Sequence, residues 1–124
     1  MEIFSKFLTE TDIKARLTVP THALMHFNMP VGDNNVELFP RDSDGNEWRF
    51  RCYTRPNGHP KPAFTTGWLD FVRVKGLQIG DQVTFSNEDE AGVVPQYRIR
   101  ATRTITLFGE QHVIDLPQQF APNA

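Results

Sequence analysis

Hydrophobic and polar residues alternate in several short stretches of the chain, with the period of two that is typical of β-strands. The alternation is clearest in residues 35–39 and 48–53. Between them, residues 42–46 read Asp-Ser-Asp-Gly-Asn, a composition that favours a hairpin turn because Asp and Gly tolerate positive φ angles. Comparable runs predict seven short strands in all: 2–8, 16–19, 35–39, 48–53, 63–65, 82–86 and 96–104.

Two stretches follow a helical pattern instead. Residues 21–27 come directly after Pro20 and are long enough for one or two turns. A second helix is predicted from Thr66, a candidate N-cap, to Gly76, with apolar residues at helical spacing between them. The pattern therefore predicts an all-β fold with two short helices over residues 1–106, and a flexible C-terminal tail over 107–124.

The strand predicted at 48–53 has two different faces. Trp48, Phe50 and Cys52 share one face, and Arg49, Arg51 and Tyr53 share the other. We expect the first face to be buried and the arginines to lie on the solvent side.

Composition fits one globular domain of 124 residues. The single cysteine, Cys52, excludes an internal disulfide and suits a reducing compartment. No apolar run resembles a signal peptide or a membrane span, so we expect a soluble intracellular protein without a membrane role.

The net charge of −2 argues against a nucleic-acid-binding protein, but the charges are unevenly distributed. Between residues 49 and 75 the chain has one acid, Asp70. The basic residues in the same interval are Arg49, Arg51, Arg55, Lys61, Arg73 and Lys75. One face of the molecule can therefore be cationic while the whole is acidic.

Catalytic and metal-binding patterns are weak. His22 and His26 have the spacing of a metal-binding helix, but no third ligand follows a suggestive spacing. The 42–46 segment lacks the glycine position and the flanking helices of a calcium loop. No serine lies in a nucleophile motif, and Cys52 is expected to be buried. The sequence thus predicts no enzyme, no metal and no cofactor.

The segment from Arg55 to Lys61 can read DNA. An arginine matches the O6 and N7 atoms of guanine, and an asparagine such as Asn57 matches the N6 and N7 atoms of adenine. Proline residues stiffen the segment and lower the cost of ordering it on binding. On residue types alone, a DNA-reading loop and an ordinary solvated loop are equally well supported.

The order of motifs favours the first interpretation. The run Gly45-x-x-Trp48-x-Phe50-Arg51, followed by Thr66-Gly67-Trp68-x-x-Phe71-Val72-x-x-Lys75-Gly76-Leu77-x-x-Gly80-Asp81-x-Val83-x-Phe85, resembles the centre of the plant B3 DNA-binding domain. The run Phe4-x-Lys6-x-Leu8-Thr9-x-Thr11-Asp12-Ile13, with Leu17-Thr18-Val19-Pro20 after it, resembles the start of the same family. The resemblance extends from about Phe4 to Arg103.

This resemblance implies a seven-stranded open β-pseudobarrel that inserts two basic arms into the major groove of double-stranded DNA, in a plant transcription factor of the nucleus. The N-terminal arm would hold Lys6, Thr9, Thr11, Lys14 and Arg16. The C-terminal arm would hold Arg51, Arg55, Asn57, His59 and Lys61. Arg55 and Asn57 are expected to read bases, and Lys6, Lys14, Arg51 and Lys61 to contact phosphates. The family matches at Trp48, Phe50, Trp68, Phe71, Val83 and Phe85 are expected to form the core.

Proline residues at 56, 60 and 62 depart from the better-characterised branches. The chain looks more like the divergent reproductive-meristem-type members. An alternative is a protein-interaction module, or a self-associating one, on a B3-like barrel that has lost specific DNA binding.

Overall fold

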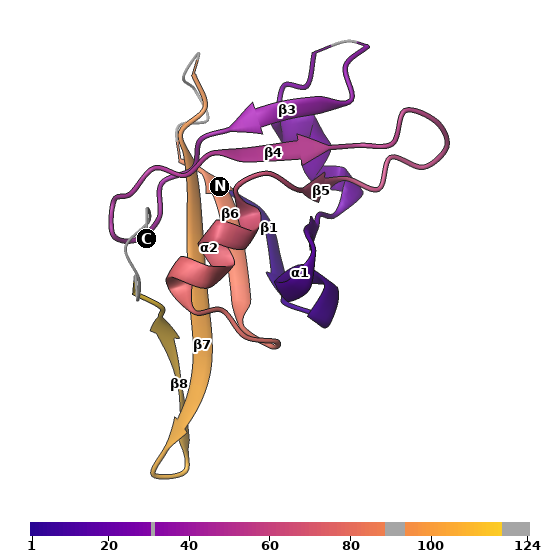
Figure 1. Ribbon diagram of the computed structural model, residues 1–124. Coiled ribbons are helices and arrows are strands. Elements are labelled where there is room, and N and C mark those ends of the chain that lie inside the picture. Colours follow the sequence, from indigo (N-terminus) through magenta and orange to yellow (C-terminus); the bar gives the residue numbers. More distant parts are fainter. Residues whose placement is uncertain (31, 89–93, 118–124) are drawn as a thin grey trace.

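The computed structural model describes residues 1–30, 32–88 and 94–117, and these form two four-stranded antiparallel sheets (Figure 1). The first sheet has the strand order β1 (Glu2–Phe7), β6 (Gln82–Asn87), β7 (Tyr97–Leu107) and β8 (Glu110–Asp115). The second has the order β2 (Leu17–Thr18), β5 (Ala63–Phe64), β4 (Phe50–Tyr53) and β3 (Asn35–Leu38). A mostly β fold with short helices is therefore confirmed.

The short helix α1 (Glu10–Lys14) lies between the strands predicted at 2–8 and 16–19, where the sequence predicts no helix. Thr9 and Asp12 form a capping box in which each side chain accepts the other's backbone N–H. The sequence pattern does not reveal this helix, because the helix is barely longer than one turn. In addition, aspartate stands where a capping box usually has Glu or Gln. The first helix expected from the pattern, residues 21–27, is instead the 3₁₀ helix η1 (Thr21–His26).

Helix α2 (Trp68–Lys75) ends at Gly76, as predicted, but it begins differently. Gly67, not Thr66, is the N-cap, with a φ of 88°. A Cβ at position 67 would lie 1.9 Å from the backbone oxygen of Arg49, so only glycine lets the helix start this close to the strand.

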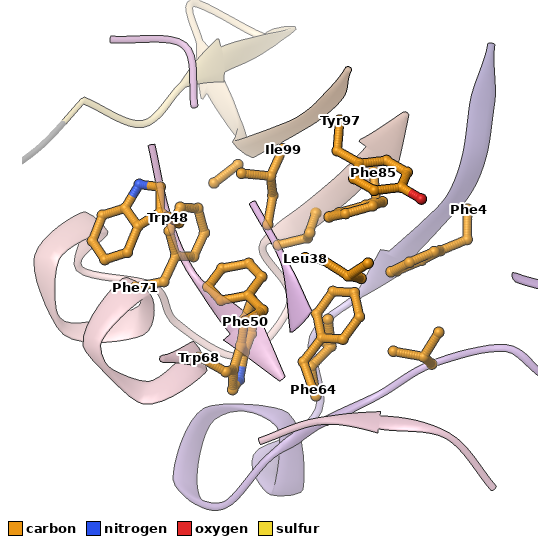
Figure 2. Close-up of a cluster of buried hydrophobic side chains, with 14 of the residues drawn as sticks. Phe4, Leu38, Trp48, Phe50, Phe64, Trp68, Phe71, Phe85, Tyr97 and Ile99 are labelled. Atoms are coloured by element: carbon orange, nitrogen blue, oxygen red, sulfur yellow. The ribbon is translucent and has the colours of Figure 1, made fainter. Parts of the chain in front are cut away.

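The core lies between the two sheets and α2 and consists largely of aromatic rings (Figure 2). Phe64 contacts Phe4, Phe50 and Phe85 with ring centroids 5.3–6.0 Å apart. The expected core residues are all buried: Trp48, Phe50, Trp68, Phe71, Val83 and Phe85. The alternation that placed Cys52 beside them is confirmed as well.

The turn between β3 and β4 joins the sheets. The Arg41 N–H donates to the Tyr97 carbonyl at 3.1 Å, and the Ile99 N–H donates to the Arg41 carbonyl at 2.9 Å. Arg41 thus bridges the second sheet to β7 at one edge, while within the described ranges the two sheets do not close into a barrel.

The described part of the chain has eight strands where the sequence predicts seven, because β8 lies in the segment predicted as a flexible tail. Residues 110–115 pair with β7 across a two-residue turn, Phe108-Gly109, and Leu116 is buried. Every residue of β8 is exposed, so the strand carries none of the buried-and-exposed alternation that the prediction relied on. Residues 118–124, also in that predicted tail, lie outside the described residues.

The predicted hairpin turn at 42–46 is confirmed, and it holds a buried charge. The Asp42 carboxylate accepts the backbone N–H groups of Asp44 and Asn46, each at 2.9 Å. Its other oxygen accepts the Trp48 indole N–H at 2.7 Å and lies 3.1 Å from the Lys75 ammonium. The Lys75 side chain is 2% exposed and also contacts Asp44 at 2.9 Å.

No helix in the described ranges is long and apolar enough to cross a membrane.

Candidate nucleic-acid interface

The first predicted arm, β1–α1–β2, is organised around the carboxylate of Asp12, whose side chain is fully buried. It accepts the Thr9 backbone N–H at 2.8 Å and the Thr18 backbone N–H at 3.1 Å. The hydroxyls of both threonines donate to it at 3.0 and 3.2 Å. The Trp68 indole N–H donates to the Asp12 carbonyl at 2.6 Å, which fastens the arm to α2.

These bonds determine the charge of the Asp12 side chain. Burial raises the pKa of its carboxyl, but hydrogen bonds from Thr9, Lys6 and Thr18 outweigh burial and hold the pKa below its ordinary value of 3.8. Asp12 is therefore an anion at neutral pH and can hold a cation beside it.

That cation is Lys6. Its ammonium lies 3.0 Å from Asp12 Oδ1, donates to the Thr18 carbonyl at 2.9 Å and donates to the Thr18 hydroxyl. An ammonium has three hydrogens to donate, and all three have partners inside the arm. The geometry gives Lys6 an internal role in the arm, and the phosphate contact that the sequence predicts for it stays a prediction.

The other residues of the first arm differ in how available they are. The Thr9 hydroxyl is engaged by Asp12, and the Lys14 ammonium pairs with Glu10 at 2.6 Å on the surface of α1. Thr11 and Arg16 are exposed. Arg16 follows α1 directly and has no side-chain hydrogen bond or ion pair with another described residue.

The second predicted arm is the loop between β4 and β5, which extends beyond the second sheet (Figure 1). The Arg55 N–H donates to the Pro60 carbonyl at 2.8 Å and closes the loop at its base. Arg55, Asn57 and His59 are exposed between these points. Lys61 has a φ of 44°, an uncommon conformation for a residue with a side chain.

The two arms meet in a hollow of about 490 Å³. Arg16 lines it from the first arm, and Arg55 and Lys61 line it from the second. The rest of the lining is Thr18, Tyr53, Pro62, Ala63 and Thr65. Three lining residues, Thr18, Tyr53 and Thr65, were not among the site residues predicted from the sequence. Tyr53 could have been included, because strand alternation places its side chain on the same face of the strand as Arg51.

Fewer basic side chains contribute to the expected cationic face than the basic residues between 49 and 75 suggest. Lys75 is buried between Asp42 and Asp44, and Arg73 is exposed on α2. Arg51 lies on the outer face of β4, where its guanidinium is 3.6 Å from Glu37. Arg55 and Lys61 remain as basic side chains of the second arm that have no acidic partner among the described residues.

The arrangement offers no metal site within residues 1–30, 32–88 and 94–117, where no three His, Cys, Asp or Glu side chains are grouped to hold an ion. His22, one half of the histidine pair, contacts the Ile3 carbonyl through Nε2 at 3.1 Å. Burial raises the pKa of the Cys52 thiol to about 12, so this thiol is not a nucleophile at neutral pH.

Comparison with known proteins places this geometry in a family. Residues 4–102 match the family model described as B3 DNA binding domain. The AP2/ERF and B3 domain-containing transcription factor RAV1 of Arabidopsis thaliana is 37% identical over 93 residues, which are 70% of this chain and 27% of RAV1. A putative AP2/ERF and B3 domain-containing protein of Oryza sativa subsp. japonica is 38% identical over 99 residues, which are 72% of this chain and 31% of that protein. The chain spans less than a third of either relative.

Solved structures agree. The protein in an Arabidopsis FUS3-DNA complex superimposes with a TM-score of 0.67 at 25% identity, covering 82% of this chain and 96% of that one. The Arabidopsis thaliana transcription factor LEC2, also solved as a DNA complex, has the same fold, with a TM-score of 0.66 at 18% identity over 82% of this chain and 92% of that one. The family match, the relatives and the shared fold establish that this chain belongs to the B3 DNA-binding domain family.

Proposed function

We propose that this chain binds double-stranded DNA by placing its two arms in the major groove, as the DNA-binding domain of a plant transcription factor that works in the nucleus. One observation carries the proposal: three basic side chains from two arms, Arg16, Arg55 and Lys61, meet in one hollow without acidic partners among the described residues. Clustered cations of this kind attract the phosphate backbone, whatever the net charge of the whole protein.

Roles within the arms follow from exposure. Arg55 and Asn57 lie on the exposed part of the loop and are proposed to contact base edges, with Thr9, Thr11 and His59 at the margins of the interface. Arg16, Lys14 and Lys61 are proposed to contact phosphates, and Arg51 to do so in competition with Glu37, which lies 3.6 Å from its guanidinium. Lys6 supports the arm from inside through Asp12. We further propose that the two sheets, joined at Arg41, act as an open pseudobarrel to which β8 is an addition. The assignment to a reproductive-meristem-like branch stays a prediction.

The test measures affinity for a random-sequence duplex at several salt concentrations. Each phosphate contact contributes about 0.9 to the slope of log affinity against log salt. The triple variant Arg16→Gln, Arg55→Gln, Lys61→Gln removes two proposed phosphate contacts and should lower that slope by about 2. The control Arg73→Gln removes an exposed arginine on α2, outside the hollow, and should leave the slope close to that of the wild type. Equal slopes for the wild type and the triple variant would overturn the assignment of the hollow.

The alternative function, a protein-interaction module, has one observation in its favour. Phe108, at the tip of the β7–β8 hairpin, is fully exposed, and Leu107 next to it is about half exposed, while Val113 lies farther along β8, opposite Thr104, and is also exposed. Exposed apolar groups gathered at one place are typical of protein contacts. A wild-type chain that binds no duplex even at 50 mM salt, where phosphate attraction is strong, would favour this function over the first.

A further inference from the structure

Strand β4 and the residues that flank it present a row of side chains along the outer face of the second sheet. Arg49, Arg51, Tyr53 and Arg55 follow one another at every second position. Alternate residues of a strand are about 6.6 Å apart on the same face. The row therefore leads from the edge of α2 to the hollow between the arms, which Tyr53 and Arg55 line.

An acid lies against one end of this row. Strand β3 pairs with β4 so that Glu37 is directly opposite Arg51. Glu37 Oε1 accepts a hydrogen bond from the Arg49 guanidinium and lies 3.6 Å from the Arg51 guanidinium. One carboxylate thus serves two arginines, and its side chain is 34% exposed.

Glu37 is an anion at neutral pH. The hydrogen bond from Arg49 and the charges of both arginines hold the pKa of the Glu37 carboxyl below its ordinary value. In the opposite direction, Glu37 raises the pKa of Arg49. The row is consequently divided into a partly neutralised end, where one carboxylate faces both Arg49 and Arg51, and a fully cationic end at Arg55.

We propose that Glu37 is a specificity-determining residue that competes with the DNA backbone for Arg49 and Arg51. This inference rests on the proposed function. A phosphate that approaches either arginine meets a carboxylate already there, so attraction to the backbone, which supplies most non-specific binding, is weakened at this end. The Glu37 carboxylate does not weaken the base contacts proposed at the hollow. Glu37 therefore lowers the affinity for non-specific DNA, and this raises the ratio of specific to non-specific affinity.

The experiment compares Glu37→Gln with the wild type on a random-sequence duplex over a range of salt concentrations. Glutamine keeps the shape of the side chain and removes its charge. The matched control is Glu110→Gln, which changes the net charge equally but lies on β8, where its carboxylate is 83% exposed and 4.0 Å from His112. Any effect of net charge alone appears in both variants.

If Glu37 competes with phosphate, E37Q should bind the random duplex about 3–10-fold more tightly at 0.1 M salt, with a slope steeper by about 0.9 for each arginine released. E110Q should change neither quantity appreciably. For a duplex carrying the site found by selection from a random library, the affinity of E37Q should rise less, so its specificity ratio should fall.

Arg49→Gln tests the pairing in both backgrounds. In the wild type it should lower non-specific affinity by less than it does in E37Q, because Glu37 already pairs with Arg49. In E37Q it should remove about 0.9 of the added slope. Thermal unfolding of each variant reports folding separately, and removal of a partly exposed ion pair of this kind should leave the unfolding midpoint close to that of the wild type.

Two failures are distinguishable. A wild type that binds no duplex at any salt concentration overturns the proposed function and, with it, the proposed role of Glu37. A wild type that binds with a salt slope, together with an E37Q variant indistinguishable from E110Q, overturns the role of Glu37 alone.

Discussion

At the scale of single residues, Asp12 is the centre of the first arm. Its carboxylate contacts β1 through Lys6, the start of α1 through Thr9 and β2 through Thr18. Removal of one member of a buried ion pair leaves its partner uncompensated, which costs more than the pair itself contributes. We expect the arm, and with it the position of Arg16, to depend on this carboxylate.

Replacement of Asp12 by Asn should lower the free energy of unfolding by about 2–4 kcal/mol, because the Lys6 ammonium loses its counter-ion and the amide cannot accept every donor. Denaturant unfolding at pH 7 measures this. Asp70→Asn, at an exposed position in the first turn of α2, is the control and should change stability by less than about 0.5 kcal/mol.

The same carboxylate gives a pH dependence. The folded-state pKa of Asp12 lies below 3.8, so its contribution to stability is complete above that value and is lost as the pH falls through the lower, folded-state pKa. The stability of the wild type should therefore decline more steeply below about pH 4 than that of D12N. Parallel acid-unfolding curves for the two proteins would contradict this assignment.

At the scale of an element, the β7–β8 hairpin is unusual in its turn. Phe108 and Gly109 form a two-residue connection with φ angles of 51° and 81°, the signature of a type I′ turn. This turn favours Asn-Gly, because asparagine tolerates the left-handed conformation and phenylalanine does not. Phe108 is also completely exposed, so burial offsets none of the strain.

Phe108→Asn should therefore stabilise the protein by about 0.5–1 kcal/mol, a rise that thermal unfolding can detect. Phe108→Ala removes the ring but keeps the unfavourable conformation, and should have little effect. A lower midpoint for the asparagine variant would show that Phe108 packs against something in solution, which would support a protein contact at this tip.

At the scale of the whole molecule, a buried charge cluster holds the two sheets and α2 together. Lys75 comes from the end of α2, and its ammonium contacts two carboxylates in the turn between β3 and β4. Arg41, next to Asp42 in the same turn, makes the backbone bonds to β7. The cluster therefore fixes the segment through which the second sheet is attached to the first.

Lys75→Met should cost about 3–5 kcal/mol, because it fills the same space but leaves the Asp42 carboxylate buried without a cation. Denaturant unfolding checks the value. Arg73→Met on the exposed side of the same helix should stay within about 0.5 kcal/mol of the wild type. Equal stability of the Lys75→Met and Arg73→Met variants would show that the charge cluster does not hold the two sheets and α2 together.

Much of the fold was determined by local sequence. Strand alternation, the Asp-Gly turn at 44–45 and Gly76 depend on residues close together in the chain, and the structure confirms the β3–β4 hairpin, the buried face of β4 and the end of α2. The arm residues Arg55, Asn57 and His59 lie in a segment whose proline and glycine content already indicated a loop between strands, and loops of this kind lie on the surface.

Other features depended on contacts between distant segments. In the sequence, Lys6, Lys75 and Arg51 are basic residues like Arg55. Folding brings an acidic partner to each of them: Asp12 to Lys6, the 42–44 turn to Lys75, and Glu37 to Arg51. Strand β8 could not be recognised because it is exposed on all sides and is defined by its pairing with β7. Local periodicity thus determined the elements and the buried face of β4. The tertiary structure alone decided which cations stay available to a ligand, because an ion pair depends on distance in space.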